Sequence, residues 1–381
     1  MAVHCADGPV WLARSCGLLC MLRRMFIRLL ISIIMTLSAQ AASAQANPLT
    51  TRLDGLFQDF NRPGCPGASV MILHRGKVAL AKAYGLANLE EKIPCGTNTN
   101  FRLASVTKQF TAMSVLILAE RKQLALDQRL TDFFPEFPDY GRQITLRHLL
   151  NHTSGLLDYE DLIPKGTEIP VVDRDVLRLL LQQDKTCLPP GTKYRYSNSA
   201  YALLALIVEA RSGNTFAHFL QENIFTPLKM SHTLAYERGL SVVPNRAYGY
   251  SPDAGGFKRT DQSLTSSVLG DGGIYSSVAD LYQWDQALYT DKLVSRKMLK
   301  LAFTPGPATD HPDTTYGFGW FIGRYRGLRE LWHSGNTIGF TTRIARFPDQ
   351  QFTVIILTNR NEAKIADFPH RIADWYLFPS P

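Results

Sequence analysis

Apolar runs bounded by turn residues occur near both ends of the chain, and they predict β-strands there. From Pro66, the run "PGASVMILHRGKVALAKAYGLAN" reads as two strands around a turn at Arg75-Gly76. Between Tyr316 and Arg360 lie four more strand-like runs, "YGFGWFIGRY", "RELWHSG", "FTTRIARFP" and "QFTVIILTNR", which short turns connect.

The middle of the chain carries apolar residues at helical spacing, framed by polar caps. A helix is expected over about residues 105–122, and another begins at the capping Thr145 of "TLRHLLNH". "DRDVLRLLLQQ" repeats its leucines at helical spacing, and "SNSAYALLALIVEARSG" has polar caps in front and Gly213 behind it. "SSVADLYQWDQALY", around Ser276, predicts a helix with a capping serine, and a last amphipathic helix is expected over about residues 362–376.

This order of elements predicts an α/β (α+β) fold, in which a mainly antiparallel sheet is built from both termini and flanked by the first and last helices. Within a catalytic domain spanning residues 46–381, the α/β lobe would take about 46–125 and 300–381. An inserted all-helical subdomain would take about 126–299. A cleft between the two lobes is the natural place for a site.

Residues 1–44 read as a leader. The stretch "MLRRMFIRLLISIIMTLSAQAASAQANP" has a basic start, an apolar run over about residues 29–37, and small residues Ala42-Ser43-Ala44 before Gln45. This layout is typical of a secretory signal peptide, and the apolar run is too short for a stable membrane span. We therefore expect a secreted or periplasmic protein with no membrane span after cleavage. An uncleaved anchor is the alternative, because the run is rich in Ile and Leu.

Composition and charge exclude some classes of protein. The chain has 381 residues, of which 45% are hydrophobic and 19% charged, as is ordinary for a globular protein. The formal charge of +8 includes a net +3 in residues 1–44, which leaves +5 on the remainder. Because no run of like charges suggests a nucleic-acid-binding arm, no nucleic-acid partner is expected.

Cysteine and histidine spacing gives no firm disulfide and no metal centre. Cys65, Cys95 and Cys187 remain after leader removal, and an oxidising compartment permits one disulfide among them. Cys65 and Cys95 bracket the predicted hairpin and could meet, which the sequence leaves open. His148 and His152 could share a helix face, but with no third ligand in view a structural role is expected. We expect neither a metal nor a cofactor.

Ser105 and Lys108 lie three residues apart in "LASVTKQFTAMSVLIL", so a helix would place them on one face, one turn apart. A serine hydroxyl becomes a good nucleophile when a base takes its proton. Desolvation can lower the lysine pKa from its ordinary ~10.4 far enough for the amine to be that base. Alone, S-x-x-K is a weak signal, because a capping serine beside a lysine that extends to solvent gives the same pattern.

Two further motifs supply the groups that such a reaction needs. Tyr196-Ser197-Asn198 lies just before a predicted helix, where the tyrosine hydroxyl could share a proton with the lysine and the amide could orient substrate and lysine. His333-Ser334-Gly335 ends a strand, where Gly335 would let a substrate carbonyl approach. The N–H of Asn336, and that of Ser105 at the start of its helix, could stabilise an oxyanion.

In this order, S-x-x-K, Y-x-N and H-S-G resemble the motifs of the serine β-lactamase and penicillin-binding-protein superfamily, specifically its class C-like branch of esterases, D-amino-acid peptidases and β-lactamases. The similarity continues through "ITLRHLLNHTSGL", "PPGTKYRYSNSAYALLA" and "GDGGIYSSVADLYQW", and it covers nearly all of residues 50–360. The fold that it implies is β-lactamase/transpeptidase-like, the same sheet and inserted helical subdomain that the pattern predicts.

The resemblance also implies a role for each motif residue. Ser105 would be the acylated nucleophile, Lys108 its proton acceptor and Tyr196 the partner acid/base. The N–H groups of Ser105 and Asn336 would form the oxyanion hole. The implied substrate-binding residues are Asn198, His333, Ser334, Gly335 and Asn336.

His333 departs from the resemblance, because β-lactamases of this class carry a lysine at this place. A mostly neutral histidine supplies a hydrogen bond but little of the positive field that attracts a drug carboxylate. The alternative is that His333 packs structurally and that a nearby cation such as Arg343 reads the carboxylate.

We expect an exported serine hydrolase that cleaves an ester or amide of a small-molecule or peptide substrate through an acyl-enzyme. Esterase or D-amino-acid-type peptidase activity is preferred, because His333 argues against antibiotic hydrolysis as the main role. The alternatives are a class C-like β-lactamase and a slowly deacylating penicillin-binding or sensor domain. The oligomeric state is not indicated by the sequence.

The leader hypothesis predicts that exported mature protein begins near Gln45, because Ala42 and Ala44 suit signal peptidase. N-terminal sequencing of exported material measures this directly. Residues 1–20 fit no leader, and a start at Met21 or Met25 would make them an artefact of start-site choice. Exported protein that retains Met21 or Met25 would contradict cleavage and favour an anchor.

Overall fold

The computed structural model of the chain describes residues 1–2, 48–361 and 364–379. The apolar run and the cleavage site of the predicted leader lie outside the described residues. Contacts divide the chain into two units, residues 1–52 and 53–381, and the fold below is that of the second unit. Within the described ranges, no helix is long and apolar enough to cross a lipid bilayer.

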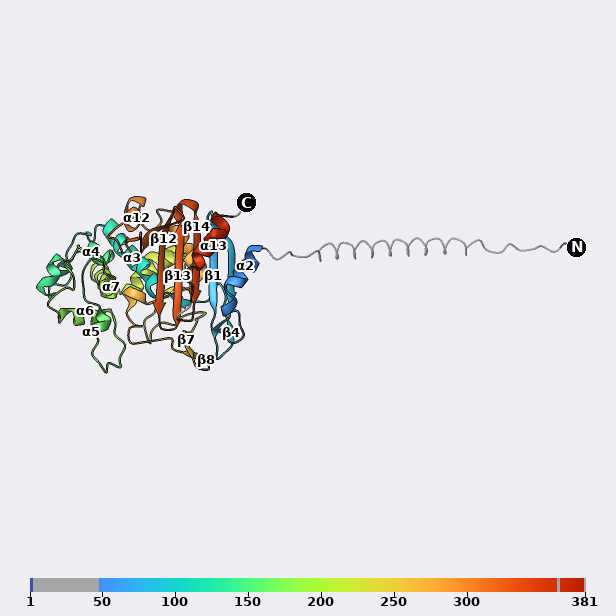
Figure 1. Cartoon of the computed structure of the whole chain (residues 1–381), viewed down its shortest axis with the longest axis horizontal. Coiled ribbons are helices and arrows are strands. Elements are labelled where there is room, and N and C mark those ends of the chain that lie inside the picture. Colours follow the sequence, from blue (N-terminus) through green and yellow to red (C-terminus); the bar gives the residue numbers. More distant parts are fainter. Residues whose placement is uncertain (3–47, 362–363, 380–381) are drawn as a thin grey trace. The chain divides into compact units, whose positions relative to one another are not determined.

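The main sheet has seven antiparallel strands, and it joins the two ends of the sequence. Its spatial order is β10 (Thr315–Tyr316), β11 (Phe321–Tyr325), β12 (Leu328–Thr337), β13 (Phe340–Phe347), β14 (Phe352–Thr358), β1 (Ala68–His74) and β2 (Lys77–Tyr84). β1 pairs with β14 from Ala68 opposite Thr358 to His74 opposite Phe352. Figure 1 shows the blue N-terminal strand β1 beside the red strand β14. The prediction of one sheet built from both ends of the chain is therefore confirmed.

The first hairpin also follows its prediction. β1 and β2 are joined at Arg75 and Gly76, where φ is 52° and 74°. Two successive left-handed residues form the kind of two-residue turn that matches the twist of the flanking strands.

The two faces of the sheet bury different helices. One face packs with α3 (Lys108–Glu120) in a large core, to which the sheet contributes Met71, Leu73, Leu331, Ile344 and Ile355. The other face packs with α13 (Phe368–Leu377) and with the end of α2 (Pro48–Leu56), and it contributes Val70, Ile72, Phe347, Val354 and Ile356. α13 begins later than the predicted residue 362, with Pro369 in its first turn, where the missing N–H of proline is tolerated.

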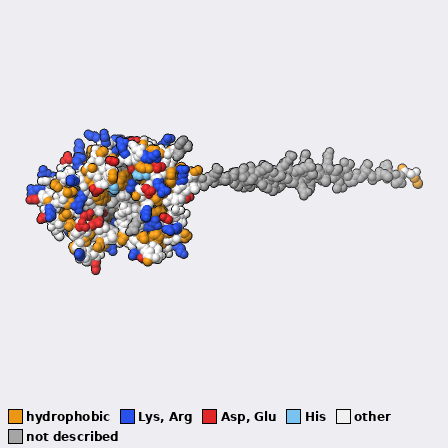
Figure 2. Space-filling model, viewed as in Figure 1, with side chains coloured by type: hydrophobic (Ala, Val, Ile, Leu, Met, Phe, Trp, Pro, Cys, Tyr) orange, Lys and Arg blue, Asp and Glu red, His pale blue; other side chains and the backbone are white. Residues whose placement is uncertain are grey.

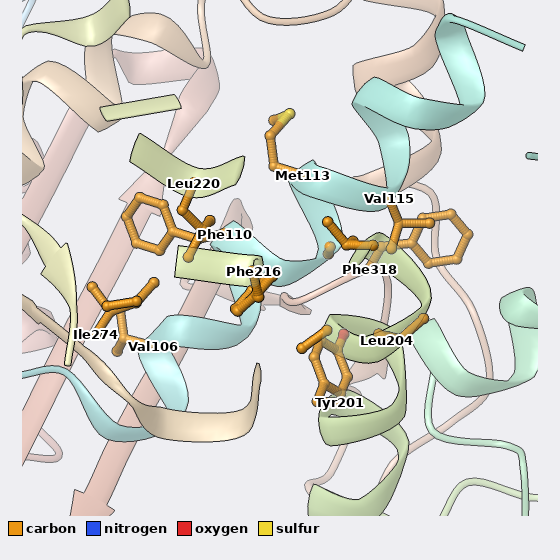
Figure 3. Packing of buried hydrophobic residues seen from close by; sticks show 14 of the residues in the cluster. Val106, Phe110, Met113, Val115, Tyr201, Leu204, Phe216, Leu220, Ile274 and Phe318 are labelled. Atoms are coloured by element: carbon orange, nitrogen blue, oxygen red, sulfur yellow. The ribbon is translucent and has the colours of Figure 1, made fainter. Parts of the chain in front are cut away.

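α3 is the buried centre of this unit. All of its residues from Lys108 to Leu118 are buried, as is expected of a helix with apolar neighbours on every side. Phe110, Met113 and Val115 of α3 belong to one hydrophobic cluster with Tyr201 and Leu204 of α7 (Asn198–Ser212), and Figure 3 labels all five. Any polar side chain at the start of α3 is thereby held away from water.

The predicted helix caps occur in the structure. The Thr145 side chain accepts from the N–H of His148 at the start of α4 (Leu146–Leu150). α7 begins after the capping Ser197 and ends at Gly213, whose φ of 73° is left-handed. Ser277 caps α11 (Val278–Ala287). The other helices of this part are α5 (Tyr159–Leu162), α6 (Asp173–Leu181), α8 (Phe216–Leu220), α9 (Thr226–Leu228), α10 (Leu269–Gly272) and α12 (Arg296–Ala302).

Short strands that the sequence pattern did not indicate accompany these helices. β5 (Phe101–Arg102), β9 (Ile274–Ser276) and β6 (Leu234–Ala235) form a three-stranded sheet. β3 (Leu86–Asn88) pairs with β4 (Ile93–Pro94), and β7 (Tyr250–Asp253) pairs with β8 (Gly256–Arg259). The division into an α/β lobe and a helical lobe stays a prediction.

Two further observations concern the cysteines and the surface. Cys65, Cys95 and Cys187 are all free thiols, so the disulfide that the sequence left open is not formed here.

Basic and acidic side chains are both spread over the face seen in Figure 2, in keeping with the mild net charge.

Candidate active site

Ser105 lies in a tight turn that is held on two sides. A 3-10 helix over Ala104–Thr107 precedes α3, so the α-helix begins at Lys108 rather than at the predicted Ser105. Ala104 has a φ of 49°, which costs a residue with a Cβ about 1–2 kcal/mol. Leu103 fixes the turn, because its N–H donates to the Ile274 carbonyl (2.8 Å) and its carbonyl accepts from Thr342 Oγ1 (2.7 Å).

The Lys108 amine is buried against three acceptors. Its Nζ lies 3.1 Å from Ser105 Oγ, 2.8 Å from Asn198 Oδ1 and 2.9 Å from the Asp271 carbonyl oxygen. Burial lowers the pKa of Lys108 to about 8, against the opposing effect of the Asp271 and Glu160 charges. With such a pKa, roughly one lysine in ten is neutral at pH 7. The S-x-x-K pair is thus in hydrogen-bond contact, with an amine that can accept a proton.

Tyr196 lies beside this pair. Lys108 Nζ is 4.9 Å from the centre of the Tyr196 ring. Burial raises the pKa of the Tyr196 hydroxyl above its ordinary value, although a hydrogen bond with Ser105 partly lowers it. The phenol therefore keeps its proton at neutral pH, which suits a group that donates a proton to a leaving group.

Asn198 is the first residue of α7, and its side-chain amide is fixed at both ends. Oδ1 accepts from Lys108 Nζ, and Nδ2 donates to Glu160 Oε1 at 3.1 Å. Ser197 begins the helix by accepting the N–H of Ala200 (3.1 Å). The cap of α7 thus places the asparagine against the lysine.

His333 lies in β12 but does not offer a free ring nitrogen. Its Nδ1 donates to the Ser334 carbonyl (2.7 Å), so its Nε2 accepts from the Tyr316 hydroxyl (2.9 Å). Burial, aided by the Lys108 charge, lowers the pKa of His333 to about 3, so the ring is neutral at physiological pH. His333 is 1% exposed and both of its ring nitrogens are engaged within the protein, and its hydrogen bond to a substrate stays a prediction. These contacts favour the first half of the alternative, in which His333 packs structurally.

Gly335 lies where β12 packs against the turn before Ser105. A Cβ at this position would lie 2.1 Å from the Leu103 carbonyl oxygen and 2.4 Å from Thr342 Oγ1. The space on the Cβ side of Gly335 is therefore filled by the turn before Ser105, and the approach of a substrate carbonyl stays a prediction. Glycine lets β12 approach the nucleophile closely. Ser334, its neighbour, is partly exposed.

A small cavity of about 50 Å³ opens beside Ser105. Asn198 and Asn336 also line it, so the structure brings three of the predicted residues together around one space. The other lining residues are Arg102, Ala104, Tyr159, Glu160, Thr265, Asp271, Gly272 and Thr337. Arg343 is not among them, and its guanidinium lies 4.4 Å from the centre of the Trp332 ring. Larger hollows of about 360 and 510 Å³ contain none of the predicted site residues.

Sequence reasoning missed the acidic side of this cavity. Asp158 caps α5 by accepting the N–H of Glu160 (3.2 Å), and Asp271 accepts from the Tyr159 hydroxyl (3.0 Å). Burial and mutual repulsion raise the pKa values of Asp158, Glu160 and Asp271. In the sequence these residues belong to "DYED" and to "GDGG", and neither stretch has a spacing that points to Ser105.

The two histidines considered as metal ligands have separate structural contacts. His148 Nδ1 accepts the N–H of Thr145, and His152 Nδ1 accepts the N–H of Ser197 (3.1 Å). The His152 ring lies 4.3 Å from the Tyr196 ring and so supports the tyrosine. Among the residues that the structure describes, no three His, Cys, Asp or Glu side chains form a metal-binding group.

The fold and site define a class of protein, and comparison with known families agrees. A family model described as Beta-lactamase matches residues 53–373. A penicillin-binding protein of Bacillus subtilis (strain 168) is 33% identical over 81% of this chain and 72% of its own length. The chain therefore belongs to the Beta-lactamase family of serine hydrolases.

One further relative and two solved structures are similar to this chain. A D-aminopeptidase of Cereibacter sphaeroides is 28% identical over 77% of this chain, which spans 57% of that protein. The crystal structure of a penicillin binding protein from Bacillus halodurans superposes with a TM-score of 0.73, at 26% identity, over 88% of this chain and 100% of that one. A D-amino acid amidase from Ochrobactrum anthropi, complexed with L-phenylalanine amide, gives 0.74 at 25% identity, over 87% and 98% of the two chains.

Proposed function

We propose that this protein is an exported serine hydrolase that cleaves an amide or ester through an acyl-enzyme on Ser105. The observation that carries the proposal is the contact between the buried Lys108 amine and Ser105 Oγ, at 3.1 Å. A desolvated lysine beside a serine hydroxyl is an activated nucleophile.

The reaction follows from the contacts around Ser105. Neutral Lys108 takes the hydroxyl proton, and Ser105 Oγ bonds to the substrate carbonyl carbon. The N–H groups of Ser105 and Asn336 stabilise the oxyanion. As the carbonyl re-forms, the bond to the leaving group breaks, and Tyr196 donates its proton to that group. Lys108 then returns a proton to Tyr196, and a water molecule hydrolyses the acyl-serine ester.

The charges around the cavity favour a substrate that carries a free amine. Glu160 lines the cavity, and Asp158 and Asp271 add negative charge nearby. Arg102 also lines it; its Nε and Nη2 donate to the Gly272 and Ser266 carbonyls, and among the described residues its Nη1 has no hydrogen-bond partner. A neutral His333 adds no cation for a substrate carboxylate. D-aminopeptidase and D-amino acid amidase relatives agree with a D-amino-acid amide or peptide as substrate.

A second candidate function is a slowly deacylating penicillin-binding domain. The penicillin-binding protein of Bacillus subtilis favours it, because acylation without turnover needs the same Ser105 and Lys108. A class C-like β-lactamase is less favoured, because the neutral His333 stands where that class usually has a lysine.

The full chain should turn over p-nitrophenyl acetate and D-alanine p-nitroanilide steadily, and a chromogenic cephalosporin with a lower kcat/KM. Ser105→Ala should lower kcat at least about a thousandfold, and Lys108→Ala nearly as much, because nucleophile and base act as one unit. Stopped-flow and steady-state kinetics measure both. If every substrate gives one equivalent of product and then no further turnover, the protein is a slowly deacylating penicillin-binding domain. Covalent labelling of a serine other than Ser105, such as Ser334, would end the assignment.

Glu160→Gln should weaken recognition of the substrate amine. Glutamine still accepts from Asn198 Nδ2 but removes the charge, so we expect kcat/KM for D-alanine p-nitroanilide to fall about three- to fivefold. The N-acetylated anilide, which lacks the ammonium, should change less than twofold. Asp161→Asn is the matched control, since Asp161 follows on the same helix but does not line the cavity. Equal losses on both anilides would contradict an amine-binding role.

A further inference from the structure

The Lys108 amine donates a hydrogen bond to the backbone of the short helix α10. Its successive carbonyls have three different partners. Gly270 accepts from Thr111 Oγ1 (2.7 Å), Asp271 from Lys108 Nζ (2.9 Å) and Gly272 from Arg102 Nε (3.2 Å). The position of α10 therefore decides where one of the lysine's acceptors lies.

The direction of the lysine lone pair depends on this acceptor. A neutral amine has two N–H donors and one lone pair in a tetrahedral arrangement. Asn198 Oδ1 and the Asp271 carbonyl take the two donors, and the third direction then faces Ser105 Oγ. If the Asp271 carbonyl moves, the amine can rotate about its flexible side chain, and the lone pair no longer aims at the hydroxyl.

Asp173 holds α10 from the side away from the substrate. This first residue of α6 is 8% exposed. Its Oδ2 accepts the N–H of Leu269 (2.8 Å), and its Oδ1 accepts the N–H of Gly270 (2.9 Å). One carboxylate thus accepts the backbone N–H groups of the first two residues of α10.

Packing leaves α10 little freedom elsewhere. A Cβ on Gly270 would lie 2.3 Å from the Tyr201 carbonyl oxygen of α7, so the backbones of α10 and α7 are in close contact. α7 supports one side of α10, and Thr111 of α3 holds a carbonyl. Asp173 supplies a further anchor, from α6.

We infer that Asp173 is a positioning residue for the hydrolytic reaction, which orients the Lys108 amine through the Asp271 carbonyl without touching the substrate. The inference rests on the proposed function, since it concerns the base of that reaction. Asp173 does not line the cavity beside Ser105, and its carboxylate bonds neither Ser105 nor Lys108.

The test compares Asp173→Asn with Asp175→Asn in the full chain. An asparagine side chain can accept only one of the two backbone N–H groups, and it turns its own NH2 group toward the other. Asp175 lies on the same helical turn, accepts the N–H of Val172 (3.1 Å) and pairs with Arg178 (2.7 Å), but does not bond to α10. The measurements are kcat and KM for p-nitrophenyl acetate and the rate of fluorophosphonate labelling of Ser105. Labelling is measured at pH 9, where Lys108, with a pKa of about 8, is mostly neutral.

Asp173→Asn should lower kcat and the labelling rate about tenfold, with KM within twofold of wild type, whereas Asp175→Asn should change neither. A folded Asp173→Asn protein with wild-type kcat and labelling would overturn the inference, as would a loss carried by KM alone. If Asp173→Asn does not fold, Thr111→Val removes the hydroxyl that holds Gly270 and should lower kcat about threefold. No loss in that variant would also overturn it. Wild-type protein that is never labelled at Ser105 would instead refute the proposed function.

Discussion

The burial of the Lys108 amine is the constraint on which the rest of the site depends. A charged ammonium without partners in a protein interior costs several kcal/mol. Here three acceptors offset that cost, and each comes from a different part of the chain: the nucleophile turn, the start of α7 and the backbone of α10. The compensation is incomplete, so the pKa of Lys108 falls to about 8. A fully compensated ammonium would keep its proton and could not serve as a base. An ammonium without hydrogen-bond acceptors would not stay buried.

The fold also holds Ser105 beside a strained backbone position. The left-handed Ala104 persists because Leu103 is bonded to both β9 and β13, and because Gly335 lets β12 lie against the same turn. Strained backbone at a functional site normally requires such support from the surrounding structure. The sheet that joins both ends of the sequence thus fixes the position of Ser105, and the helices fix the side chains around it.

The sequence was sufficient for the elements and the central motif but not for the groups around it. Apolar periodicity and caps predict β1, β2, the C-terminal strands, α4, α7 and α11, because these signals are local. The pairing of Ser105 with Lys108 is also local. By contrast, the hydrogen bond between Tyr316 and His333 depends on tertiary packing. The same is true of the hydrogen bonds that Asp173 accepts from the N–H groups of α10. Neither has a spacing that marks it in the sequence. The 3-10 turn at Ser105 was missed because propensity gives no sign that Ala104 adopts a positive φ.

The most direct test of this account is the titration of the Lys108 amine in the resting protein. Side-chain NMR of lysine-labelled full chain, with the Lys108 signal assigned by its disappearance in Lys108→Met, gives the midpoint without any substrate. The account predicts a midpoint near pH 8, because desolvation outweighs the neighbouring carboxylates. A midpoint near the ordinary lysine value of ~10.4 would show a fully compensated ammonium and would contradict its role as the base.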